Sequence, residues 1–128
     1  MLLSLLIHFR FHSEKRIGKG FQIEYTGLEL LTSCGGSFSN SSGILTSPLH
    51  PQPYPLMADC VYLISQLEGT YVNINFLNMD IDCQGITSDF IEVRDGFSGD
   101  SPLMGRFCGN GTSTPALMTS TQNYLRIR

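Results

Sequence analysis

Four widely spaced cysteines constrain this chain more than any other feature of its sequence. They are Cys34, Cys60, Cys83 and Cys108, each about 25 residues from the next. None belongs to a Cys-x-x-Cys pair, and no histidine lies at metal-ligand spacing from them, which argues against a zinc site. An even number of widely spaced cysteines is typical of disulfides formed in an oxidising compartment. Four cysteines allow three connectivities, and spacing alone does not choose among them.

Two glycosylation sequons point to the same compartment. Asn40-Ser41-Ser42 and Asn110-Gly111-Thr112 both match the Asn-x-Ser/Thr pattern. They predict N-glycans at Asn40 and Asn110 on surface loops of a secreted protein. Together with the cysteines, they predict an extracellular or cell-surface location.

Length and charge limit the possible functions. The chain has 128 residues, enough for one domain core, and a formal net charge of −3. From Cys34 onward, eight acidic residues face four basic ones. This balance argues against nucleic acid as a partner and suits cations or basic protein surfaces.

The apolar run at residues 1–7 is too short to be a membrane span. His8 and Arg10 interrupt it, no basic region precedes it, and no small-residue cleavage site follows. We therefore predict neither a working signal peptide nor a membrane span in this chain.

The pattern from Cys34 onward predicts short β-strands. Runs of β-branched and aromatic residues at 61–64, 71–76, 90–93 and 124–127 alternate with turn signals such as Asp95-Gly96. Short strands at such regular intervals predict an antiparallel β-sandwich. Upstream, residues 5–11 and 21–25 also alternate around a turn at 16–20. They predict a β-hairpin, which is marginal in isolation and must pack on another surface.

Three motifs together resemble the CUB domain family. The first is CGGSFSNSSGILTSP at residues 34–48, followed by HPQPYP at 50–55; the others are DFIEVRDG at 89–96 and PLMGRFCG at 102–109. They occur in the family's order over residues 34–128. The resemblance implies an all-β, jelly-roll-like CUB sandwich. Within the family, the opening is most similar to repeats of multi-CUB endocytic receptors.

The resemblance also divides the chain. Residues 1–26 are similar to the last hairpin of a preceding CUB repeat, 27–33 form a linker, and 34–128 resemble a CUB domain without its last strands. The hairpin at 5–25 is the equivalent of those strands. We therefore hypothesise that it folds back onto the sandwich and brings Phe21 or Ile23 against the core around Val93. The alternative is a detached hairpin.

The resemblance implies specific site residues. It pairs Cys34 with Cys60 and Cys83 with Cys108, although Cys83 lies further before Asp89 than is usual in the family. It places a calcium site at Asp82 and Asp89, with Tyr54 nearby as a ligand-contacting residue. Asp82 replaces the family's glutamate, and the family's second aspartate falls beyond residue 128. Carboxylate oxygens are what Ca²⁺ requires, but solvated loop acids are the alternative interpretation.

These residues predict a binding module and not an enzyme. No histidine belongs to a Gly-x-Ser-x-Gly or HExxH context. The resemblance implies a module of an endocytic receptor that captures soluble proteins by a basic side chain, next to neighbouring CUB repeats. Two alternatives remain: a non-catalytic module of a complement- or tolloid-type protease, and a spermadhesin-like secreted protein.

Overall fold

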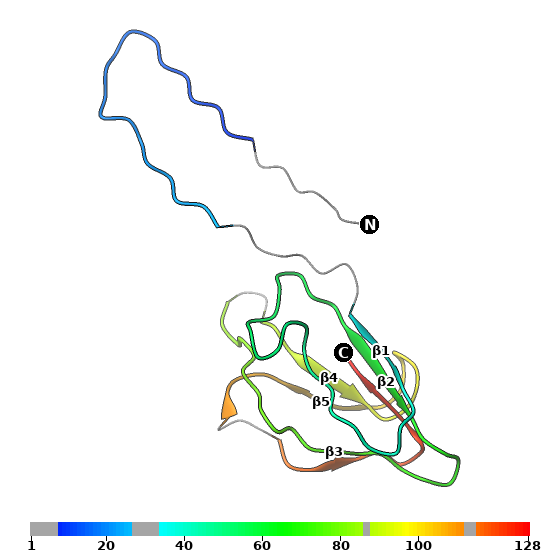
Figure 1. The fold of residues 1–128 in the computed structure, drawn as a ribbon. Coiled ribbons are helices and arrows are strands. Elements are labelled where there is room, and N and C mark those ends of the chain that lie inside the picture. Colours follow the sequence, from blue (N-terminus) through cyan, green and yellow to red (C-terminus); the bar gives the residue numbers. More distant parts are fainter. Residues whose placement is uncertain (1–7, 27–33, 86–87, 112–114) are drawn as a thin grey trace.

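The computed structural model describes residues 8–26, 34–85, 88–111 and 115–128 (Figure 1). Within these ranges it contains β-strands and no α-helix, which confirms the all-β class. In the same ranges, no helix is long and apolar enough to span a bilayer. The strands are β1 (Gly35–Phe38), β2 (Val61–Ser65), β3 (Asn73–Ile74), β4 (Ile91–Arg94), β5 (Leu103–Phe107), β6 (Met118–Thr119) and β7 (Tyr124–Ile127).

The strands form two sheets. The larger has five strands in the order β1-β2-β7-β4-β5, and the smaller pairs β3 with β6. β1 runs parallel to β2, and the other pairs are antiparallel. β7 lies between β2 and β4, so the last strand in sequence holds the larger sheet together.

The core lies between the two sheets. Val93 of β4 and Leu125 of β7 are fully buried, and Val72, next to β3, is 6% exposed. Ile74 of the small sheet and Met118 of its partner strand pack against this cluster. Apolar side chains from both sheets therefore meet in one layer, which is the predicted sandwich.

The sequence pattern predicted β2, β4 and β7 but gave no strand signal for β1 or β5. Both are glycine-containing: β1 reads GGSF and β5 reads LMGRF. In β1, Gly35 has φ of +82°, and a β-carbon there would overlap the carbonyl oxygen of Val61 on β2. These segments are strands because of what they pair with, which their own composition does not reveal.

The strand predicted at 71–76 is only two residues long. At its start, the Ser120 hydroxyl accepts the Val72 N–H at 2.7 Å, and the Ser120 N–H donates to the Val72 carbonyl at 2.9 Å. A side-chain oxygen thus replaces a backbone acceptor, which shortens the regular ladder while keeping the buried N–H satisfied.

The predicted N-terminal hairpin is not formed in the described part of its range. Residues 8–26 contain no strand, and residues 5–7 and the linker at 27–33 lie outside the described residues. Phe11 and Phe21 touch across the turn, with ring centroids 5.2 Å apart. Phe21 is 66% exposed and Ile23 is 51% exposed, and neither packs on the core cluster.

The hypothesis that this segment completes the sandwich is therefore wrong. Residues 8–26 extend away from the sandwich (Figure 1). Two strands without a third surface bury too little apolar area to offset the entropy of ordering them. That residues 1–26 come from a preceding CUB repeat stays a prediction.

Both disulfides implied by the resemblance are present in the structure. Cys34–Cys60 joins the residue before β1 to the residue before β2, and Cys83–Cys108 joins the loop after β3 to the end of β5. No free cysteine remains among the described residues. The first bond fixes the opening strand, and the second fixes the loop that carries the predicted acidic site.

Candidate functional site

The structure brings the three predicted site residues together, although they are far apart in sequence. The Tyr54 hydroxyl donates to Oδ2 of Asp89 at 2.6 Å, and it accepts the backbone N–H of Asp82 at 3.2 Å. Pro55, directly after Tyr54, is buried. The buried proline anchors the loop, so the tyrosine next to it is held over the acidic loop.

Hydrogen bonds fix Asp82 and Asp89 relative to each other. The Asp89 N–H donates to the Asp82 carbonyl at 3.0 Å, which closes the loop between them. The Gln84 N–H donates to Oδ1 of Asp82 at 2.8 Å, and Ile81 forms an antiparallel bridge with Gly109. The Cys83–Cys108 bond fastens the same loop to β5. The two carboxylates therefore stand on a constrained frame.

The phenol keeps its proton in this setting. Burial raises the pKa of Tyr54 above its ordinary value of 10.0, and the hydrogen bond to Asp89 raises it further. Tyr54 is therefore a hydrogen-bond donor at neutral pH. Its bond to Asp89 orients one carboxylate oxygen and leaves the other available to a ligand.

Three of the four arginines in the sandwich form ion pairs away from Asp82 and Asp89. Arg94 and Arg106 pair with Glu92, and Arg128 pairs with Asp59. Of the ion pairs formed by described residues, none neutralises Asp82 or Asp89. Asp82 and Asp89 are both exposed. The arrangement offers negative oxygen acceptors to a cation that the described part of the chain does not supply.

The carboxylates of Asp82 and Asp89 are the type of ligand that calcium prefers, but they are too few to complete its coordination shell. Ca²⁺ takes about six to eight oxygen ligands from carboxylates, carbonyls and water. No group of three or more metal-ligating side chains gathers within the described ranges. Asp82 and Asp89 are the two carboxylates at this site, so an ion held here needs other oxygens as well.

The buried carboxylate of Glu92 was not singled out by the sequence reasoning. Glu92 is 4% exposed. One of its carboxylate oxygens accepts a hydrogen bond from Nε–H of Arg94 at 2.7 Å, and the other accepts one from Nε–H of Arg106 at 2.8 Å. Arg106 also lies over the Phe90 ring, 4.7 Å from its centroid. The Asp-Phe-Ile-Glu-Val-Arg motif contained the signal: alternation places Glu92 and Arg94 on the same face of a strand. This cluster is a structural ion pair that, within the described residues, shares no hydrogen bond with Tyr54, Asp82 or Asp89.

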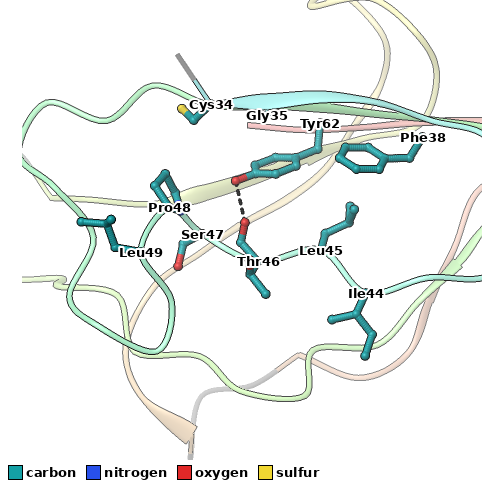
Figure 2. A pocket seen from close by; sticks show the side chains of 10 residues that line it. All are labelled: Cys34, Gly35, Phe38, Ile44, Leu45, Thr46, Ser47, Pro48, Leu49 and Tyr62. Carbon is teal, nitrogen blue, oxygen red and sulfur yellow. Dashed lines mark hydrogen bonds between the residues drawn. The ribbon is translucent and has the colours of Figure 1, made fainter. Parts of the chain in front are cut away.

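A second feature is an open pocket of about 390 Å³ between β1 and the segment at 44–49 (Figure 2). The rings of Phe38 and Tyr62 stack along one wall, with centroids 6.1 Å apart. The Tyr62 hydroxyl donates to the Thr46 carbonyl at 2.8 Å, which ties the segment to the sheet.

The predicted glycosylation residues Asn40 and Asn110 are both exposed, and their modification stays a prediction.

The fold and the disulfides define an extracellular β-sandwich module, and comparison with known proteins gives its family. The CUB domain family model matches residues 34–128. The chain therefore belongs to the CUB domain family, and it is an extracellular or cell-surface module.

Among similar proteins, human cubilin is 34% identical over 117 residues, which is 87% of this chain and 3% of cubilin. Bone morphogenetic protein 1 of Xenopus laevis is 39% identical over 125 residues, 97% of this chain and 16% of that protein. Human tolloid-like protein 1 is 36% identical over 113 residues, 88% of this chain and 11% of that protein. The chain thus spans a small fraction of each of these relatives.

Two solved structures are similar. The full extracellular region of zebrafish Gpr126/Adgrg6 matches with a TM-score of 0.62 and 32% identity, over 75% of this chain and 12% of that one. The CUB1-EGF-CUB2 domains of rat MASP-1 match with a TM-score of 0.61 and 28% identity, over 73% of this chain and 33% of that one.

Proposed function

We propose that this module is a non-catalytic binding domain that captures protein ligands through Tyr54, Asp82 and Asp89. The observation that carries the proposal is the hydrogen-bonded contact between Tyr54 and both aspartate positions. A lysine or arginine of a partner supplies the cation that these carboxylates lack. Charge-assisted hydrogen bonds of this kind are short, strong and selective.

Calcium has a supporting role in this proposal. Asp82 and Asp89 are the side chains that would hold the ion, and its chemistry there is to gather carboxylate oxygens that otherwise repel one another. Tyr54 orients Asp89 through its hydrogen bond to Oδ2. We therefore expect calcium to tighten the capture of a basic side chain.

In the larger protein, we propose a role as one repeat of an endocytic receptor that captures soluble ligands, next to other CUB repeats. The similarity to cubilin supports this role. The second candidate is an interaction module of a tolloid-type protease. It is favoured by the match to bone morphogenetic protein 1, which is 39% identical over 97% of this chain.

The proposal is tested with a defined probe because the ligand is unidentified. Biotinylated peptides, identical except for a central lysine, arginine or glutamine, are displayed on streptavidin so that multivalency raises weak affinities. Binding of the whole chain is measured by biolayer interferometry in CaCl₂ and in EDTA. The lysine and arginine peptides should bind, the glutamine peptide should not, and EDTA should weaken binding.

Matched variants separate the site from the overall charge. Asp89→Asn should weaken binding by about tenfold or more, because it removes the negative charge from a charge-assisted bond worth about 1.5–3 kcal/mol. Asp100→Asn makes the same change in net charge in the exposed turn after β4 and should leave binding unchanged. Equal losses in the two variants, or equal binding of the glutamine peptide, would show that general electrostatics and not this site holds the probe.

A further inference from the structure

The pocket between β1 and residues 44–49 lies directly beside a glycosylation sequon. Asn40 follows the end of β1 by two residues, in a bend after which the chain returns to line the pocket. Phe38 precedes Asn40 by two residues and Ile44 follows it by four, and both line the pocket. A group attached to Asn40 therefore starts on the short segment that connects two residues of the pocket lining, Phe38 and Ile44.

The wall next to Asn40 is apolar and exposed. Phe38 is 37% exposed and Ile44 is 76% exposed. Figure 2 shows the Tyr62–Thr46 hydrogen bond crossing the pocket, with Phe38, Leu45 and Ile44 together on one side of it. That bond fixes the width of the pocket, and stacking on Tyr62 fixes the ring of Phe38.

The backbone of Asn40 is also fixed. Its carbonyl accepts Nε2 of Gln66 at 2.7 Å, which ties the bend to the residue after β2. A sugar attached at this position therefore begins from a held backbone and needs to lose less freedom to reach the ring.

We propose that this pocket is a carbohydrate-binding surface for the N-glycan of Asn40 in the same chain. One face of the first N-acetylglucosamine consists of C–H groups, and these carry partial positive charge that suits the negative face of the Phe38 ring. The sugar's hydroxyl and amide groups stay in water, so packing costs little desolvation. The glycan covers exposed Phe38 and Ile44, and it shields β1, the edge strand of the larger sheet.

The test uses the whole chain secreted from a eukaryotic cell line and trimmed enzymatically to one N-acetylglucosamine per site. Ser42→Ala removes the first sequon without changing Asn40, and Thr112→Ala removes the second in the same way as a matched control. Each variant is made with Phe38 and with Phe38→Leu, which keeps an apolar side chain but removes the ring. Unfolding midpoints are measured by differential scanning calorimetry.

The proposal predicts that the sugar on Asn40 raises the midpoint by about 3 °C, the order expected for a contact of this size in a small domain. In Phe38→Leu most of this gain should disappear. Loss of the second sequon should leave the gain intact. Because each comparison is made within one Phe38 background, a change in basal stability does not obscure the result.

A direct readout locates the sugar. With ¹³C-labelled glycan, the N-acetylglucosamine protons should show nuclear Overhauser contacts to the Phe38 ring and upfield ring-current shifts. An unmodified Asn40 in the secreted protein, an equal gain in both Phe38 backgrounds, or sugar resonances without contacts to the ring would each overturn the proposal.

Discussion

At the residue scale, the two groups of carboxylates in this module have different partners and so different roles. Glu92 is buried and bonded to Arg94 and Arg106, whereas Asp89 is exposed and bonded to an uncharged tyrosine. Removing a buried carboxylate that has two guanidinium partners destabilises the fold, because the remaining charges are left uncompensated. An exposed carboxylate with a neutral donor is free to attract a cation. The hydrogen-bond partners of Glu92 and Asp89 therefore explain why the first is structural and the second is a candidate for binding.

The Glu92 cluster can be tested through stability. Glu92→Gln should lower the free energy of unfolding by about 2 kcal/mol, because it replaces two charge-assisted hydrogen bonds and leaves two arginines without their counter-ion. Urea unfolding at pH 7 measures the change. Glu68→Gln makes the same charge change in an exposed turn and should alter stability little. Equal stability of the two variants would remove the structural role of the cluster.

The loss of stability caused by Glu92→Gln should depend on pH, and the pKa of Glu92 gives the direction of that dependence. Hydrogen bonds from Arg94 first, and then Arg106, lower the pKa of Glu92 below its ordinary value of 4.5. A carboxyl whose pKa is lower in the folded state stabilises the fold above its unfolded pKa, and this contribution is lost as pH falls through the folded value. The stability gap between wild type and Glu92→Gln should therefore be constant near neutrality and narrow below about pH 4.5. A gap that widens in acid contradicts the assignment.

At the scale of elements, the strand pattern was predictable where side chains carry it. Residues 61–64 and 124–127 alternate or carry β-branched and aromatic side chains, and both are strands in the larger sheet. β1 escaped prediction because Gly35 serves a close approach between backbones, which is a tertiary requirement. The N-terminal alternation failed for the opposite reason: a strand pattern forms no strand without a surface to bury it.

The glycines of the opening motif give a direct test at this scale. Gly35→Ala should destabilise the module by about 2 kcal/mol or more, since Gly35 has φ of +82° and a β-carbon there overlaps the Val61 carbonyl. Gly43→Ala is the matched control, because nothing lies within 4 Å of a β-carbon at that position. Chemical denaturation compares the two. If Gly35→Ala is as stable as Gly43→Ala, the close pairing of β1 with β2 is incorrect.

At the scale of the whole molecule, the sandwich has a small core and two disulfides. The fully buried large side chains among the described residues are Val93 and Leu125, so covalent links carry much of the stability. The double variant Cys83→Ser/Cys108→Ser should lose about 3 kcal/mol in the chain-entropy model for a loop of this length. It should also loosen the acidic loop and weaken peptide capture more than Glu92→Gln does. Retained capture with reduced stability would show that the bond does not position the site.

The candidate site could be predicted from sequence only through the resemblance. Tyr54 and Asp89 are separated by 35 residues, and no local pattern relates them. The motifs supplied the register that places them together. The contacts that fix the site, such as the Asp82 amide on the tyrosine hydroxyl, depend on loop geometry that residue types alone do not encode. The pocket beside Asn40 arises in the same way, from the return of residues 44–49 across β1.

Amide chemical shifts show where on the molecule a ligand is captured. The ¹⁵N-labelled chain is titrated with the lysine peptide in the presence of calcium, and shift changes are mapped onto the structure. We expect the largest changes at Tyr54, Asp82 and Asp89, and we expect Asp89→Asn to remove them. Changes that gather instead along β5 or at the pocket beside β1, with these three amides unmoved, would contradict capture at this site.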